Sequence, residues 1–157
     1  MVDDFSSGSN VRRFNRSGLD WRSYQLGVIA AFAEVVQMGC KRLALSSPMT
    51  EDQYTEIIDQ TRLIAEERNV VLYVDDDFLE TRLFDPEHTE GKIVIHIAVD
   101  QETVDDYLAL KGKKRDHTRD GTLTDEKENQ IAWSLGRLLS YDNRSIERLI
   151  TNRGYKP

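Results

Sequence analysis

Three short apolar runs, each bounded by polar or turn-forming residues, limit what this chain can fold into. The runs are "RLALSS" (42–47), "VVLYV" (70–74) and "KIVIHIAV" (92–99). Short apolar runs of this kind, with β-branched residues prominent in the last two, are typical of buried strands. Strands that bury both faces need helices to cover them, so we expect an α/β fold.

The segments between these runs have helical spacing and recognisable helix ends. Apolar residues recur at the helical period over residues 21–35 and again over residues 54–65. Two further helices are expected near the C-terminus. The expected helix starts are Thr50, in capping-box spacing with Gln53, then Asp100 and Thr124, and the expected helix ends are Gly39 and Asn69.

The order strand, helix, strand, short connection, strand, helix favours a parallel sheet with helices on its faces. We therefore expect a three-layer sandwich with a short, mostly parallel sheet of at least three strands and a C-terminal helix pair. The 157 residues are expected to form a polar, basic tail at 1–19 and a single α/β domain at 20–157. The tract "KGKKRDHTRDG" (111–121) has no apolar period, so we expect a charged loop there.

Composition narrows the class of protein. The net charge of −7 counts against a general nucleic-acid binder. Cys40 is the single cysteine, so no internal disulfide can form, and no apolar run approaches the roughly 20 residues of a membrane span. The polar N-terminus does not resemble a secretory signal, so a soluble, cytoplasmic protein is expected. Open sheet edges favour a homo-oligomer.

Acidic residues follow the second and third strand-like runs. Parallel strands would bring Asp75, Asp77 and Asp100 to one edge of the sheet, where ligands bind in such folds. Carboxylates so gathered would take Mg²⁺ or Mn²⁺. The alternative is that Asp77 caps a short helix over "DFLETRLF" (77–84). In either case Asp75 ends a buried strand, where its carboxylate needs a backbone N–H group, an arginine or a cation as a partner.

Hydroxyl and basic side chains give a second group of candidate ligand-binding residues. The helix start after the first strand can bind an anion, and the charged tract can act as a flap over an anionic molecule. The alternatives are that the hydroxyls only cap the helix and that the charges are solvated. His96 lies within a strand-like run and is expected to be a hydrogen-bonded core residue. The candidates for ligand binding are Ser46, Ser47, Thr50, Lys113, Lys114 and Arg115.

Three functional hypotheses follow. The first is a non-catalytic accessory or regulatory domain that binds a protein partner or a small ligand at the C-terminal edge of the sheet, because no complete catalytic set is visible. The second is a divalent-metal-dependent enzyme acting on a phosphorylated small molecule. The third is a DNA-associated factor, which the acidic composition disfavours. The sequence leaves open whether the chain is an enzyme and favours the answer that it is not.

Overall fold

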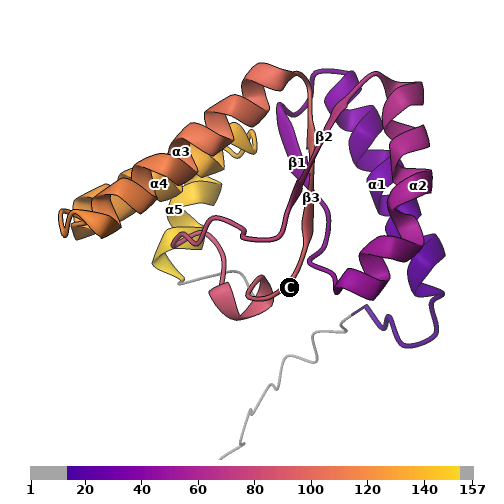
Figure 1. Cartoon of the computed structure of the whole chain (residues 1–157), viewed down its shortest axis with the longest axis horizontal. Helices are drawn as coiled ribbons and strands as arrows, with labels where there is room; N and C mark the ends of the chain where they lie inside the picture. Colours follow the sequence, from indigo (N-terminus) through magenta and orange to yellow (C-terminus); the bar gives the residue numbers. More distant parts are fainter. Residues whose placement is uncertain (1–13, 153–157) are drawn as a thin grey trace, which may run out of the picture.

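A computed structural model describes residues 14–152, so most of the predicted tail lies outside the described residues. Figure 1 shows a layered arrangement, with α1 and α2 on one face of the sheet and α3, α4 and α5 on the other. The elements in chain order are α1 (Trp21–Gln37), β1 (Leu43–Leu45), α2 (Glu51–Arg68), β2 (Val71–Asp75), the 3-10 helix η1 (Pro86–His88), β3 (Val94–Ala98), α3 (Gln101–Arg119), α4 (Asp125–Leu138) and α5 (Asn143–Thr151).

The sheet is antiparallel, and the predicted parallel sheet is wrong. The strand order is β1-β3-β2, and the central strand β3 pairs antiparallel with both neighbours. Parallel neighbours need a crossover connection, usually an α-helix, whereas antiparallel neighbours do not. The connection between β2 and β3 contains only η1, so β3 returns beside β2 in the opposite direction.

The central strand β3 is buried at every position, as its apolar run predicted. The strand β2 was expected to be covered on both faces, but it lies at the edge of the sheet and its Val74 is 36% exposed. Two apolar clusters pack against the sheet. Ile29, Ile57 and Ile97 belong to the cluster beneath α1 and α2, while Tyr107 and Leu135 belong to the cluster on the other face.

The helix ends predicted at Thr50, Asn69, Asp100 and Thr124 are confirmed. They could be predicted because they depend on hydrogen bonds between residues close in sequence. Thr50 and Gln53 form the reciprocal capping box of α2, and Asn69 ends that helix in the left-handed conformation at φ 51°. The side chains of Asp100 and Thr124 accept backbone hydrogen bonds at the starts of α3 and α4. Among residues 14–152, no helix has both the length and the apolar character needed to cross a membrane.

The tract at 111–121 is mostly helical, which corrects the predicted loop. The helix α3 continues to Arg119 and ends near Gly121, which has a φ of +66°. Lysine and arginine are good helix formers, and one glycine inside a helix costs only about 1 kcal/mol. Polar contacts of Lys111 and Lys114 replace the apolar contacts that the sequence pattern lacks.

The contact between α4 and α5 has no room for a side chain at Gly136. A methyl group added there would lie 2.6 Å from Cγ1 of Ile146, which is fully buried. Gly27, on the exposed side of α1, has no neighbouring atom within 4 Å of the same added carbon. Close packing against Ile146 therefore excludes a side chain at Gly136, whereas no neighbouring atom excludes one at Gly27.

We expect Gly136→Ala to lower the free energy of unfolding by about 1–3 kcal/mol, because α5 must shift to accommodate the methyl group. Gly27→Ala should raise it by about 0.4–1 kcal/mol, because alanine restricts the unfolded chain and favours helix. Urea denaturation followed by circular dichroism measures both. Equal effects of the two substitutions would contradict the close packing of α4 on α5.

Candidate functional site

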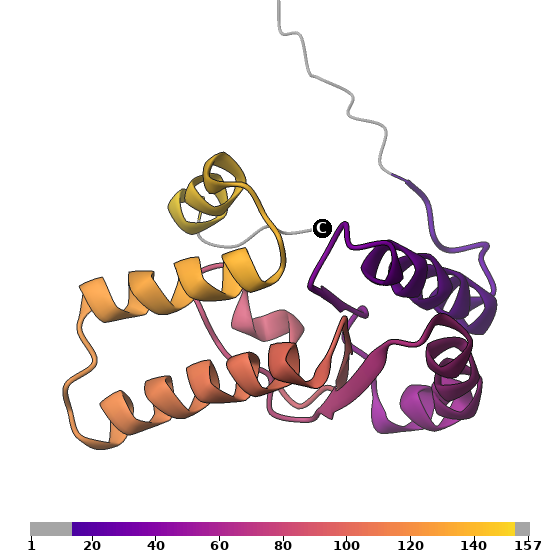
Figure 2. The ribbon, with the colours of Figure 1, turned by 90° about the horizontal axis from the view of Figure 1, so that it is seen from above.

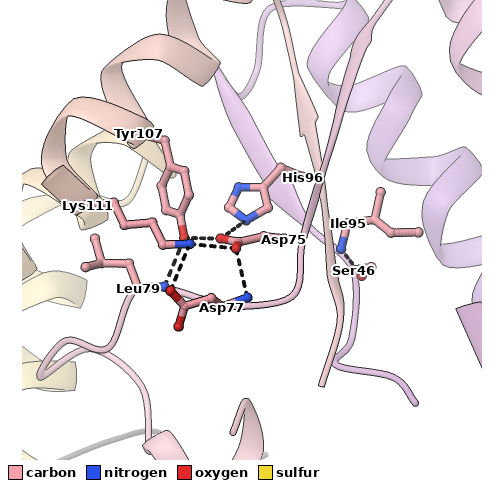
Figure 3. Close-up of polar contacts among 8 residues, drawn as sticks. All are labelled: Ser46, Asp75, Asp77, Leu79, Ile95, His96, Tyr107 and Lys111. Carbon is pink, nitrogen blue, oxygen red and sulfur yellow. Dashed lines mark hydrogen bonds and ion pairs between the residues drawn. The ribbon is translucent and has the colours of Figure 1, made fainter. Parts of the chain in front are cut away.

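Asp75 is the centre of a buried polar cluster that joins β2 to α3 (Figure 3). Its carboxylate, only 1% exposed, accepts hydrogen bonds at both oxygens. Oδ2 accepts a 2.6 Å hydrogen bond from the Tyr107 hydroxyl. Oδ1 accepts one of 2.8 Å from Lys111 Nζ and one of 3.1 Å from the backbone N–H of Asp77. The strand-end carboxylate thus has both a backbone N–H group and a cation as partners.

The cluster holds its ionisable groups in fixed protonation states. Burial would by itself raise the pKa of Asp75, but the polar contacts with His96, Lys111 and Tyr107 outweigh burial and hold the pKa far below its ordinary value. Burial and the Asp75 carboxylate both raise the pKa of Tyr107 well above its ordinary value. Tyr107 is therefore protonated at neutral pH and serves as a hydrogen-bond donor, not as a base.

His96 is buried as predicted, but the predicted hydrogen bond is absent among the described residues. Its Nε2 atom lies 3.5 Å from Oδ2 of Asp75, within ion-pair range, yet neither ring nitrogen makes a hydrogen bond. The imidazole ring packs against Tyr107, with ring centroids 4.3 Å apart. Burial lowers the pKa of His96 more than Asp75 raises it. Because Lys111 already offsets the Asp75 charge, His96 is neutral.

The structure does not bring the three predicted metal ligands together. Asp75 pairs with Val94 at one end of β3, whereas Asp100 follows the other end, roughly 20 Å away at about 3.3 Å per residue. The Asp77 side chain is 89% exposed, with Oδ2 3.7 Å from Lys111 Nζ. Within residues 14–152, no group of three or more His, Cys, Asp or Glu side chains is placed to hold a metal ion.

The short helix at 77–84, the alternative to a metal site, is also absent. The segment after β2 is irregular because its backbone donors bond to side chains outside a helix. The N–H of Asp77 bonds to the Asp75 carboxylate, and the N–H of Leu79 donates to the Tyr107 hydroxyl at 3.0 Å. Asp77 therefore caps no helix, and residues 77–80 run alongside α3 instead.

Between residues 77–80 and α3 lies a hollow of about 440 Å³, which we name the basic groove. Lys114 donates a 2.6 Å hydrogen bond to the Glu80 carbonyl and lies 3.5 Å from Glu128. Arg115 has no ion-pair or hydrogen-bond partner within the described part of the chain. The charged side chains that line the groove are Lys111, Lys114, Arg115, Arg119, Asp77 and Glu80, so cations outnumber carboxylates.

The predicted ligand-binding residues are divided among separate places. Lys114 and Arg115 line the basic groove, whereas Lys113 lines hollows elsewhere on α3. Ser46 and Ser47 line a second hollow, of about 410 Å³, at the end of the sheet, and Phe78 lines both this hollow and the basic groove.

Two of the three hydroxyl groups of the predicted set, those of Ser46 and Thr50, form hydrogen bonds with the backbone. Ser46 Oγ accepts a 2.9 Å hydrogen bond from the backbone N–H of Ile95 and donates a 3.0 Å hydrogen bond to the Ser47 carbonyl. Thr50 caps α2, as the alternative in the sequence predicted. These contacts fix the connection that follows β1. The Ser47 side chain forms no hydrogen bond within the part of the chain that the structure describes.

Sequence reasoning missed Tyr107 and Lys111 as members of the site. Their spacing of four residues places both on one face of α3, which would have been a usable signal if the charged tract had been recognised as helix. No protein-family model matches the chain, and comparisons with curated proteins and with solved structures found no match. Functional interpretation therefore depends on the geometry of these side chains.

We expect Lys111→Met to lower the free energy of unfolding by about 3 kcal/mol, because it leaves the buried Asp75 carboxylate without its cation. Lys113→Met, two positions along the same helix at an exposed site, should change it by less than about 0.5 kcal/mol. Chemical denaturation at neutral pH measures the difference. If both variants lost the same stability, the Asp75–Lys111 pair would not anchor α3.

The folded protein should lose stability as the pH falls from about 7 to about 5. The pKa of His96 in the folded state is below its ordinary value of 6.5, so in this pH range the imidazole binds a proton more readily in the unfolded chain than in the folded one. Proton binding therefore favours the unfolded chain as the pH falls. His96→Phe should remove this loss and cost little at neutral pH, because no hydrogen bond is broken. The free energy of unfolding of the wild type and of His96→Phe, measured across this pH range, tests both expectations. His88→Gln, at an exposed position, is the control and should retain the wild-type slope.

Proposed function

We propose that this chain is a non-catalytic accessory or regulatory domain that binds an anionic small molecule in the basic groove. One observation carries the proposal: four cationic side chains from the second half of α3 line a single groove in a protein whose net charge is −7. A local cation-rich site on an acidic protein attracts small anions, while the surrounding negative charge opposes long polyanions such as DNA.

The four cations differ in what they can offer a ligand. Lys111 is paired with Asp75, Lys114 with Glu128, and Arg119 with acidic neighbours on its own helix. Arg115 is exposed and has no such partner among the described residues, so its guanidinium can form two parallel hydrogen bonds to a carboxylate or phosphate. We therefore assign Arg115 as the main ligand-binding residue.

The volume of the basic groove is consistent with a small ligand. A volume of about 440 Å³ is within the roughly 300–1,000 Å³ range of small-molecule sites. Phe78 and Leu79 give the groove an apolar wall, and the Tyr107 hydroxyl that anchors the Leu79 backbone keeps that wall in place. A compact phosphate- or carboxylate-bearing molecule fits this combination better than an extended chain does.

A binding role suits the protonation states of the buried cluster. Both Asp75 oxygens already accept hydrogen bonds, and the raised pKa of Tyr107 keeps its proton in place. An acid–base catalyst instead needs a pKa near the working pH and reach to the substrate. The cluster therefore supports the shape of the groove and does not supply chemistry to it.

Titration calorimetry and thermal shift with inorganic phosphate, pyrophosphate and citrate test the proposal. We expect at least one anion to bind and, at a hundredfold its dissociation constant, to stabilise the fold by about 2.7 kcal/mol. Arg115→Ala should weaken binding by about 10- to 100-fold, the value of a charge-assisted hydrogen bond. Lys113→Ala, which removes a cation outside the groove, should bind as wild type does. Failure of all three anions to bind, or an equal loss in both variants, would refute the proposal.

A further inference from the structure

The outer edge of β2 presents backbone groups that the sheet does not use. On β3, the odd-numbered residues bond toward β1, as the hydrogen bond from Ser46 N–H to the Ile95 carbonyl shows. Neighbouring residues of a strand point their N–H and C=O groups in opposite directions. Tyr73 pairs with the even-numbered His96 and bonds inward, so Leu72 and Val74 direct their N–H and C=O groups away from the sheet.

The two edges of the sheet differ in length and burial. At one edge, β1 has only three residues, of which Leu43 and Ala44 are at most 1% exposed. The connection between α4 and α5 also contacts the residues just before β1: Ser140 Oγ accepts from the N–H of Arg42, and Lys41 Nζ donates to the Leu139 carbonyl. At the opposite edge, β2 lies on the side of the sheet away from α4 and α5 (Figure 2). No hydrogen bond to the backbone of Leu72 or Val74 from outside the sheet occurs within residues 14–152.

The sequence of β2 ends with the inward-pointing charge of Asp75 but lacks other usual protections of an exposed edge. Natural edge strands carry lysine, proline or a bulge that prevents another strand from pairing. The strand "VLYVD" has neither residue, and its register with β3 is continuous over all five positions. Val74 adds an apolar side chain that is 36% exposed. These features are typical of an edge that is covered by another strand.

We infer that β2 pairs antiparallel with β2 of a second copy of this chain, so that the two sheets become one. Centred on Tyr73, this arrangement sets Leu72 opposite Val74 of the second copy, and the outward N–H and C=O groups of both residues become paired. The contact is isologous, so it closes as a dimer and uses the β2 edge of both copies. The dimer goes beyond the proposed ligand binding, because Leu72 and Val74 do not line the basic groove.

Charge favours the antiparallel arrangement over the parallel one. Three aspartates, residues 75–77, end the strand. Antiparallel pairing places the two acidic ends at opposite ends of the contact, whereas parallel pairing would place like charges side by side. Each chain still carries a net charge of −7, so added salt should strengthen the dimer by screening the repulsion between copies.

Sedimentation equilibrium or light scattering over a concentration series tests the dimer. We expect a concentration-dependent species of twice the 18.1 kDa chain mass. Val74→Lys should make the protein monomeric at all concentrations. Val99→Lys, at a valine with the same 36% exposure that directly follows β3 and bonds to Arg42, should leave the dimer intact. A wild-type monomer at every concentration, or a Val74→Lys dimer, would overturn the inference.

Amide hydrogen exchange on the wild-type chain gives a test that does not depend on a folded variant. The amides of Val71 and Tyr73 should be protected in both monomer and dimer because they bond to β3. The amides of Leu72 and Val74 should gain protection only as concentration rises. Fast exchange at Leu72 and Val74 under conditions where the protein is dimeric would place the contact elsewhere and refute pairing through β2.

Discussion

The ion pair and hydrogen bonds of the Asp75 carboxylate join the end of β2 to α3. A buried carboxylate that lacks partners is strongly unfavourable, so Lys111 and Tyr107 must be brought to the end of β2 if the strand is to form as it does. That requirement fixes α3 against the sheet. The Tyr107 hydroxyl also accepts the Leu79 N–H, so the same cluster sets the path of residues 77–80 and thereby the wall of the basic groove.

The elements of the fold could be predicted from the sequence, but the strand directions could not. Helix ends at Thr50 and Asn69 depend on bonds between residues a few positions apart, and such signals are local. A buried strand has the same apolar pattern whether its neighbour runs parallel or antiparallel. Direction is decided by the connection between β2 and β3, which contains only a 3-10 helix. The pattern before it resembled a repeating strand–helix unit and favoured the wrong direction.

The candidate site was predictable only in part, for a related reason. The sequence showed that Asp75 needed a partner, and the structure supplies one backbone N–H group and one cation. It does not show that the cation is Lys111, because the charged tract has no apolar face and its pattern predicts a loop. Helix formation there depends on contacts across about 30 residues of sequence, including that between Lys114 and Glu80. Contacts of that range leave no local pattern.

Under the proposed function, the second half of α3 would serve folding and ligand binding with different side chains. Lys111 is committed to the buried carboxylate and adds no net positive charge to the groove. Lys114 is partly committed, through the Glu80 carbonyl and Glu128. Arg115 forms no hydrogen bond or ion pair within residues 14–152, so an anion could bind it without weakening the contacts that hold the helix in place. This separation explains how a helix stabilised by charged residues can also present a cationic surface.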